Sequence, residues 1–131
     1  MAIINEPPTL DAAYTTALVT NWTMAHVFEG LFTYNSRFEP APHLVERYEV
    51  DRTATSFTFR LRRGILFHSG QELAAADAAA SLRWWSQVGA TGREVFRRVN
   101  RVEESDRYTL TVTFREPTGL LPEFLAQTGA I

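Results

Sequence analysis

The sequence predicts an α+β fold with a mostly antiparallel sheet and two main helices. Two observations support this prediction. In two separate segments apolar residues alternate with polar ones next to a polar turn, as they do in β-hairpins. In two longer segments apolar residues recur at spacings of three and four, as they do on one face of a helix. Strands mixed with helices in this order are typical of the α+β class.

Composition limits the classes of function that the chain can serve. Its 131 residues are 45% hydrophobic and 21% charged, which is typical of one globular domain. No run of about 18 apolar residues is present, so we expect no membrane-spanning segment. The net charge of -2 gives no general attraction to nucleic acid or anionic lipid. The chain has no Lys and no Cys, which excludes lysine Schiff bases, P-loop lysines, thiol catalysis and thiolate metal sites.

The first third of the chain predicts one long helix between extended segments. Residues 2–10 resemble a brief strand that runs into the stiff Pro7-Pro8 pair, and residues 11–16 form a polar loop. Two apolar stripes over residues 18–32 predict a helix that packs on more than one side. Gly30 interrupts this pattern, which makes residues 31–34 a candidate strand. A turn at residues 35–37 and a rigid extended link at residues 40–42 follow.

The remainder predicts two hairpins separated by a helix. Tyr48 and Val50 belong to a short strand, and a turn over residues 51–56 leads to the half-buried strand of Phe57, Phe59 and Leu61. After a turn at residues 67–70, a helix over residues 75–87 ends at Gly89. The later elements are a short helix at residues 93–99, strands at 99–103 and 108–114 with a turn at Ser105-Asp106, a linker at 117–119 and a helix at 120–127.

Six segments, in this order and at this spacing, resemble those of one known family. They are PTLDAAYTT (8–16), VFEGLFTYN (27–35), PHLVERYEV (42–50), SFTFRLRRGILFHSG (56–70), ELAAADAAASLRWW (72–85) and YTLTVTFREP (108–117). Together they resemble the N-terminal portion of the periplasmic (extracellular) solute-binding proteins, family 5, the oligopeptide/dipeptide/nickel-binding type of ABC transporters. The sequence departs from the family pattern at four positions: Ala12 replaces Pro, Ser69 replaces Asp or Asn, Ala74 replaces a capping Thr, and Ala78 replaces Val.

The resemblance implies a fold, a place in that fold and a function. It implies that the chain forms part of a protein with the fold of the peptide-binding class of periplasmic binding proteins. Residues 1–30 would supply the first strand, cleft loop and helix of lobe I, and residues 31–131 a small accessory domain, with a natural chain that continues past Ile131. The implied function is non-enzymatic: capture of a peptide-like or other small solute in the periplasm, without a cofactor, for delivery to an ABC permease of the inner membrane. Residues 1–4 lack a signal peptide, so an exported protein would have lost its leader.

The same resemblance implies a ligand-binding segment. In the family, the loop after the first strand borders the cleft between the lobes. By that correspondence Thr15, Thr16, Ala17 and Leu18 line one wall of the cleft, with Tyr14 and Trp22 as neighbours. For any one of these residues, an ordinary surface loop explains the sequence equally well.

Two alternative functions remain open at this point. The domain can act as a stand-alone interaction or sensor module. Arg93, Arg97, Arg98 and Arg101 can form a nucleic-acid patch, although Glu94 interrupts them and three further acidic residues follow, which favours a mixed-charge solvated surface.

Two possible chemical sites are not supported by the sequence. His26 and Glu29 lack a third metal ligand nearby, so no metal site is predicted. His68, Ser69 and Asp77 lack the context of a nucleophile, so no catalytic residue is predicted.

Overall fold

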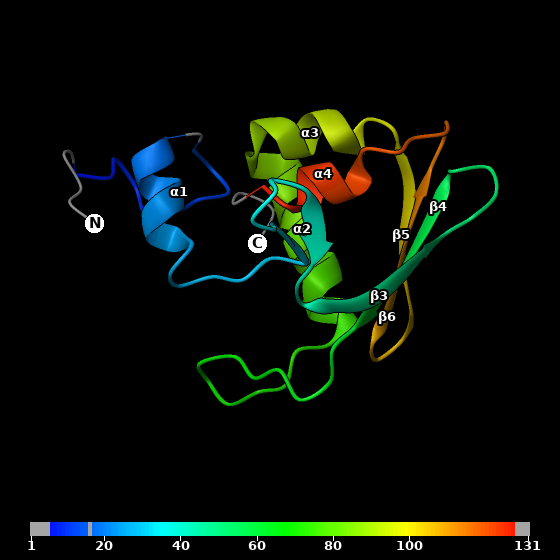
Figure 1. The fold of residues 1–131 in the computed structure, drawn as a ribbon, viewed down its shortest axis with the longest axis horizontal. Coiled ribbons are helices and arrows are strands. Elements are labelled where there is room, and N and C mark those ends of the chain that lie inside the picture. Colours follow the sequence, from blue (N-terminus) through cyan, green and yellow to red (C-terminus); the bar gives the residue numbers. More distant parts are fainter. Residues whose placement is uncertain (1–5, 16, 128–131) are drawn as a thin grey trace.

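The structure is a computed structural model that describes residues 6–15 and 17–127, and it has the α+β architecture that the sequence predicts. Figure 1 shows α1 at one end of the molecule, the larger sheet at the other and α2 between them. The elements in chain order are α1 Leu18–Met24, β1 Phe32–Tyr34, β2 Pro40–Pro42, β3 Val45–Val50, β4 Ser56–Leu61, α2 Ala75–Val88, α3 Ala90–Phe96, β5 Val99–Asp106, β6 Thr109–Phe114 and α4 Leu121–Leu125.

The two predicted hairpins join into one antiparallel sheet with the strand order β3-β4-β6-β5. The junction is the pairing of β4 with β6, in which Phe57 lies opposite Val112 and Phe59 opposite Leu110. These four side chains are almost completely buried. The predicted alternation along both strands is therefore confirmed, because side chains two apart on a strand point to the same face.

Aromatic side chains from three strands meet where β1 joins the larger sheet. The ring of Phe59 lies edge-on to that of Phe32 at 5.7 Å between centroids, and Phe32 lies edge-on to Tyr48 at 5.3 Å. Such pairs contribute about 0.5–1.5 kcal/mol each beyond the area they bury. Phe32 belongs to β1, so this cluster attaches the small β1-β2 hairpin to the larger sheet.

Helix α2 covers one face of the sheet through the apolar stripe that the sequence predicts. It packs against β5 and β6 with Ala75, Ala78, Ala79, Leu82 and Trp85, all buried. Ala74, at the N-cap, has no side-chain acceptor where Thr is usual. The Asp77 carboxylate accepts a hydrogen bond from the Ala74 N–H at 2.9 Å and puts negative charge at the helix start, where the helix dipole favours it.

The helix predicted over residues 18–32 is wrong in length and in packing. Helix α1 ends at Met24, and the next residues form turns in which the Phe28 N–H donates to the Met24 carbonyl at 2.8 Å. Most of the first apolar stripe has no partner, because Leu18, Trp22 and Phe28 are 64%, 54% and 49% exposed. A helix gains most of its stability from packing an apolar face, so a stripe without a partner does not extend it. Residues 32–34 form strand β1, which lies within the candidate strand predicted at residues 31–34.

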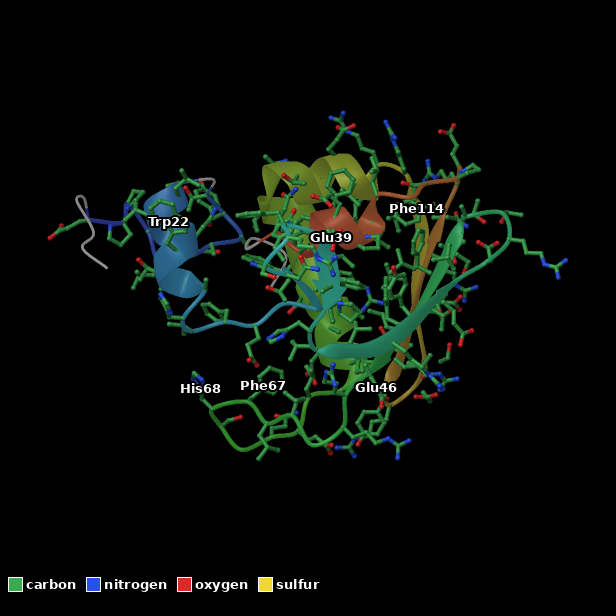
Figure 2. The ribbon with its side chains drawn as sticks, in the orientation of Figure 1. Trp22, Glu39, Glu46, Phe67, His68 and Phe114 are labelled. Atoms are coloured by element: carbon green, nitrogen blue, oxygen red, sulfur yellow. The ribbon has the colours of Figure 1, made fainter. Side chains whose placement is uncertain are left out.

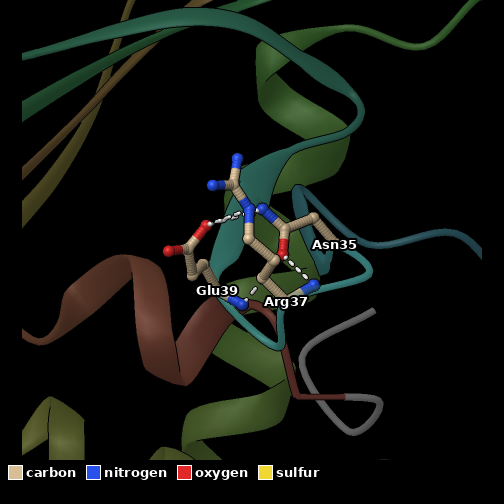
Figure 3. A network of polar contacts seen from close by, with 3 residues as sticks. All are labelled: Asn35, Arg37 and Glu39. Carbon is tan, nitrogen blue, oxygen red and sulfur yellow. Dashed lines mark hydrogen bonds and ion pairs between the residues drawn. The ribbon is translucent and has the colours of Figure 1, made fainter.

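Two further differences concern extended segments. Part of the strand expected within residues 2–10 lies outside the described residues, and residues 6–10 contain no strand. The link at residues 40–42 is strand β2, which pairs with β1. The turn between them is built on Asn35, whose side-chain oxygen accepts from the N–H groups of Arg37 and Glu39 at 2.8 and 3.0 Å (Figure 3).

The other boundaries differ from the prediction by a few residues. Helix α2 ends at Val88, α3 starts at Ala90 rather than at 93, and the turn of the second hairpin lies at Arg107 and Tyr108. No helix in the described part of the chain has the length and apolar character that a bilayer crossing requires.

Candidate functional site

Two glycines allow α3 to turn sharply at the end of α2. Gly89 is extended and buried, and Gly92 follows in the first turn of α3. A Cβ at Gly92 would lie 2.3 Å from the Trp85 carbonyl oxygen, closer than any normal contact. Across this corner the indole of Trp85 meets the ring of Phe96 edge-on at 6.4 Å. The absence of two side chains therefore brings α3 against the last turn of α2.

Arg93 folds back from α3 onto the end of α2. Its Nη1 donates to the carbonyl oxygens of Gln87 and Val88 at 3.1 and 3.0 Å. These carbonyls lie in the last turn of α2, where the helix dipole is negative and a cation is favourable. The two hydrogen bonds hold the exposed guanidinium at the α2–α3 corner.

The loop before α1 is held close to this corner. The Asp11 carboxylate accepts hydrogen bonds from the N–H groups of Ala13 and Tyr14 at 3.0 and 3.2 Å. Such turns hold short polar loops in a defined shape. The buried Ala13 side chain belongs to the hydrophobic core, and the Thr20 hydroxyl donates to the Thr9 carbonyl at 2.8 Å. Both ends of the loop are thus fixed.

The loop and the corner enclose a hollow of about 530 Å³, here called the corner pocket. Its volume lies in the range of pockets that hold small molecules. Of its lining residues only Arg93 carries a charge at neutral pH. The lining is Ala12, Ala13, Tyr14, Thr15, Asn21, Tyr34, Trp85, Val88, Gly89, Ala90, Thr91, Arg93 and Gln127.

Two polar side chains of the corner pocket differ in whether their oxygen atoms are hydrogen-bonded. Burial, and then the neighbouring Glu123 carboxylate, raise the pKa of Tyr34, so its hydroxyl stays protonated and donates to Glu123 Oε1 at 2.8 Å. Asn21, on α1, has its Oδ1 buried without a hydrogen-bond partner among the described residues. Buried hydrogen-bond acceptors are usually paired, so this wall of the pocket contains a polar atom whose hydrogen-bonding capacity is not used.

The structure separates the six residues predicted to bind ligand. Tyr14 and Thr15 line the corner pocket, where the Tyr14 side chain is 71% exposed. Ala17 precedes α1 as its N-cap, and Thr16 lies outside the described residues. Leu18 and Trp22 are exposed on α1 and do not line the pocket; Figure 2 labels Trp22 on this helix.

A second and larger hollow, of about 1220 Å³, lies between the chain before β1, the loop from β4 to α2, and α2 itself. It shares only Ala12 and Ala13 with the corner pocket and contains none of the five predicted residues that the structure describes. Exposed apolar side chains such as Phe67 and Trp84 line it, and Figure 2 shows Phe67 and His68 on the loop. Size and a largely apolar lining with several polar side chains are both typical of ligand sites. Of the two hollows, however, only the corner pocket contains Tyr14 and Thr15 of the predicted cleft loop, and for this reason it is the candidate site.

The other side chains considered for chemistry do not assemble into a site. His68, Ser69 and Asp77 all line the larger groove, yet no hydrogen bond joins them in the described residues. Glu29 Oε1 lies 3.3 Å from His43 Nε2 rather than beside His26. Within residues 6–15 and 17–127, no three potential metal ligands of the His, Cys, Asp or Glu type come together.

Sequence reasoning missed most of the corner pocket. It placed Arg93 in an arginine cluster and did not consider Tyr34 or Gln127. One signal was available in the sequence. A glycine directly follows an apolar helix, and an arginine comes four residues later. An arginine at that distance can fold back and cap the end of the preceding helix. Tyr34 and Gln127 give no such signal, because only the tertiary fold brings them to the pocket.

Comparison with known proteins points to one family. The model of the bacterial extracellular solute-binding proteins, family 5 Middle, matches residues 39–131. The probable peptide ABC transporter periplasmic-binding protein y4tO of Sinorhizobium fredii is 34% identical over 119 residues, which cover 91% of this chain and 22% of that protein.

Solved structures agree with this assignment. The binding protein AgaA of A. tumefaciens R10, in complex with agropinic acid, matches with a TM-score of 0.88 and 29% identity over 95% of this chain and 26% of its own. OppA of Burkholderia pseudomallei shows the same fold, with a TM-score of 0.80 and 21% identity over 93% of this chain and 27% of its own.

These matches confirm the predicted family and the predicted fold class of peptide-binding periplasmic proteins. The chain spans about a fifth to a quarter of the length of the relatives it matches, 22% and 26% in the two most similar cases above. Because the family match extends over most of the sequence, the chain belongs to the bacterial extracellular solute-binding proteins of family 5.

Proposed function

We propose that this chain is part of the substrate-binding component of an ABC importer and supplies one wall of its solute cleft. Family 5 proteins are transport components that bind peptides or other small solutes and work with ABC permeases. The corner pocket supports a specific place for this wall, because Tyr14 and Thr15 of the expected cleft loop line it together with the α2–α3 corner. The chain itself performs no catalysis in this proposal.

The solute is peptide-like or another small polar molecule. A relative with 34% identity is named as a probable peptide-binding protein, and AgaA, at 29% identity, is described in complex with agropinic acid. The pocket lining supports this class, because the aromatic groups of Tyr14 and Tyr34 lie beside amide and hydroxyl groups that can orient a polar ligand. The solute is captured in the periplasm and delivered to a membrane permease.

Capture proceeds by closure of two lobes around the solute. A binding protein of this kind exchanges between open and closed states, and the solute favours the closed state because it contacts both walls there. We place residues 1–30 in lobe I and residues 31–131 in an accessory domain beside it. This division is supported by the core cluster, in which Ala13 is the only described member that precedes Leu31.

One wall by itself gives little affinity, and this leads to a direct test. Isothermal titration of the 131-residue chain with mixed di- to pentapeptides is expected to show no micromolar binding, because the contacts of the opposite lobe are missing. Micromolar affinity of this chain alone would contradict the one-wall proposal.

The arginine cluster gives little support to nucleic-acid binding. Arg97 pairs with Glu94 at 3.0 Å, Arg101 pairs with Glu103 at 2.6 Å, and Arg93 is engaged with the end of α2. A surface on which cations already have acidic neighbours attracts phosphate weakly. A salt-dependent gel shift would favour the nucleic-acid function instead, and the absence of a shift at low salt would exclude it.

A further inference from the structure

Exposed apolar side chains are concentrated in the larger groove. A contiguous patch of such side chains marks a binding surface. Of the large apolar side chains that the structure describes as exposed, only two line the corner pocket, and both, Tyr14 and Tyr34, carry a hydroxyl. Six line the larger groove: Leu10, Val27, Phe28, Leu66, Phe67 and Trp84. Of the two hollows, the groove is therefore the one with the more extensive apolar surface.

The carboxylates of the groove are already engaged within the chain. Its lining contains three of them and no arginine. Asp11 and Asp77 accept hydrogen bonds from backbone N–H groups, and Glu29 Oε1 lies 3.3 Å from His43 Nε2. Groups that already hold the protein's own backbone and side chains contribute little to the binding of a charged solute. The part of the lining that is free to bind is mostly apolar, and it suits a segment with apolar side chains.

The groove lies at the junction between the two proposed units of the chain. One wall consists of residues 10–13 and 25–29, which we place in lobe I, and the other consists of Leu44, the loop from β4 to α2, and α2. The walls are joined beside the groove, where the His43 N–H donates to the Leu31 carbonyl at 3.0 Å. The lobe I part is small, because α1 buries only two of its seven residues. Further parts of lobe I that pack on this wall are continuous with the groove.

The length of the relatives indicates what covers the groove. The chain spans 22% of y4tO and 26% of AgaA, so about three quarters of a protein of this family lies outside it. Parts of one long chain commonly bury their apolar patches against each other. We infer that the larger groove binds an apolar segment from the remainder of lobe I and is not a solute site.

This inference rests on the proposed function, which places residues 1–30 in lobe I. The bound segment contacts both walls of the groove and so holds lobe I and the accessory domain together. The two units then act as one wall when the lobes close around a solute.

The test uses the absence of cysteine from the chain, because a single introduced cysteine then reports whether its position is covered. Phe67→Cys and Trp84→Cys place the thiol in the groove, on the loop and on α2. Phe38→Cys is the matched control, since Phe38 is 85% exposed and lines neither hollow. The rate of reaction with a maleimide is measured for each variant in this chain alone and in a full-length hybrid. In the hybrid this chain replaces the matching part of y4tO, and any cysteines of y4tO are replaced by serine.

The rates in the hybrid without solute decide whether the groove is covered. We expect the Phe67→Cys and Trp84→Cys thiols to react at least about tenfold more slowly than in this chain alone, because a covered thiol reacts only when the structure opens locally. The Phe38→Cys thiol is expected to react equally fast in both. Circular dichroism shows whether the hybrid is folded. If it is not, the aligned positions are labelled in y4tO itself, where slow reaction at both supports the inference and fast reaction contradicts it.

The outcomes separate the inference from the function on which it rests. If both groove thiols react as fast in the hybrid as in this chain alone, the groove is not covered and the inference is wrong. A reaction that slows only after mixed di- to pentapeptides are added would show a solute site, which also overturns it. Rates that fall as the concentration of this chain alone rises would show that a second copy covers the groove. Slow reaction without peptides supports the inference, and calorimetric titration of the same hybrid with those peptides then tests the proposed function separately.

Discussion

Replacement of Gly92 by alanine tests whether the α2–α3 corner depends on close backbone contact. The new Cβ would lie 2.3 Å from the Trp85 carbonyl oxygen and 2.7 Å from its carbonyl carbon. Both atoms are backbone, so no side-chain rotation relieves the overlap, and α3 has to move away from α2. Such overpacking costs about 3 kcal/mol, at the upper end of the usual range. The higher helix propensity of alanine returns about 1 kcal/mol. The expected net loss in the free energy of unfolding is about 2 kcal/mol.

Thermal unfolding followed by circular dichroism measures this loss. A domain of this size loses roughly 4 °C in Tm per kcal/mol, so Gly92→Ala should lower Tm by roughly 8 °C. Gly119→Ala is the matched control: no heavy atom lies within 4 Å of its Cβ position, and the expected change is within about 0.5 kcal/mol. Equal stabilities of the two variants would refute the close-contact explanation of the corner.

Two further predictions concern the domain division and the first hairpin. The segment 31–131 expressed alone should still unfold cooperatively, because all described core members except Ala13 lie within it; a broad transition without cooperativity in urea would contradict the division at residue 30. Hydrogen bonds from the Thr53 side chain, and from the backbone of Ser56 and its neighbours, lower the pKa of Asp51 from 3.8 to about 2. A carboxyl with a depressed folded-state pKa stabilises the fold above its unfolded pKa, so this contribution should be lost as pH falls from about 4 toward 2. The Tm difference between the protein and Asp51→Asn should therefore shrink over that window, and a constant difference would show that the charge of Asp51 does not matter.

Local pattern was sufficient for the elements whose apolar face is covered in the fold. The alternation of Phe57, Phe59 and Leu61 predicts a strand because side chains on one face are buried together, and β4 covers these residues. The stripe from Ala75 to Trp85 predicts α2 for the same reason, and Gly89 separates it from α3. The resemblance of six ordered segments predicts the family, which the match over residues 39–131 confirms.

Pattern was misleading where an apolar stripe had no partner. Residues 18–32 have the spacing of a long helix, yet Val27 and Phe28 stay about half exposed and α1 stops at Met24. Spacing shows which side chains would share a face, but it does not show whether another element covers that face. Phe32, at the end of the same segment, is buried in a strand because it packs against Phe59 and Tyr48.

The sequence by itself determined the class of fold, the family and the order of its hairpins and main helix, since each follows from short-range periodicity or from recognisable segments. Only the tertiary structure decided that Tyr14, Tyr34 and Arg93 surround one hollow, and that Arg93 is held by the carbonyls at the end of α2. The reason is physical: these residues are distant in sequence, and the packing of Gly92 on Trp85 and the burial of Ala13 in the core bring them together. Contacts of this kind depend on the shape of the whole core, and no local pattern records them.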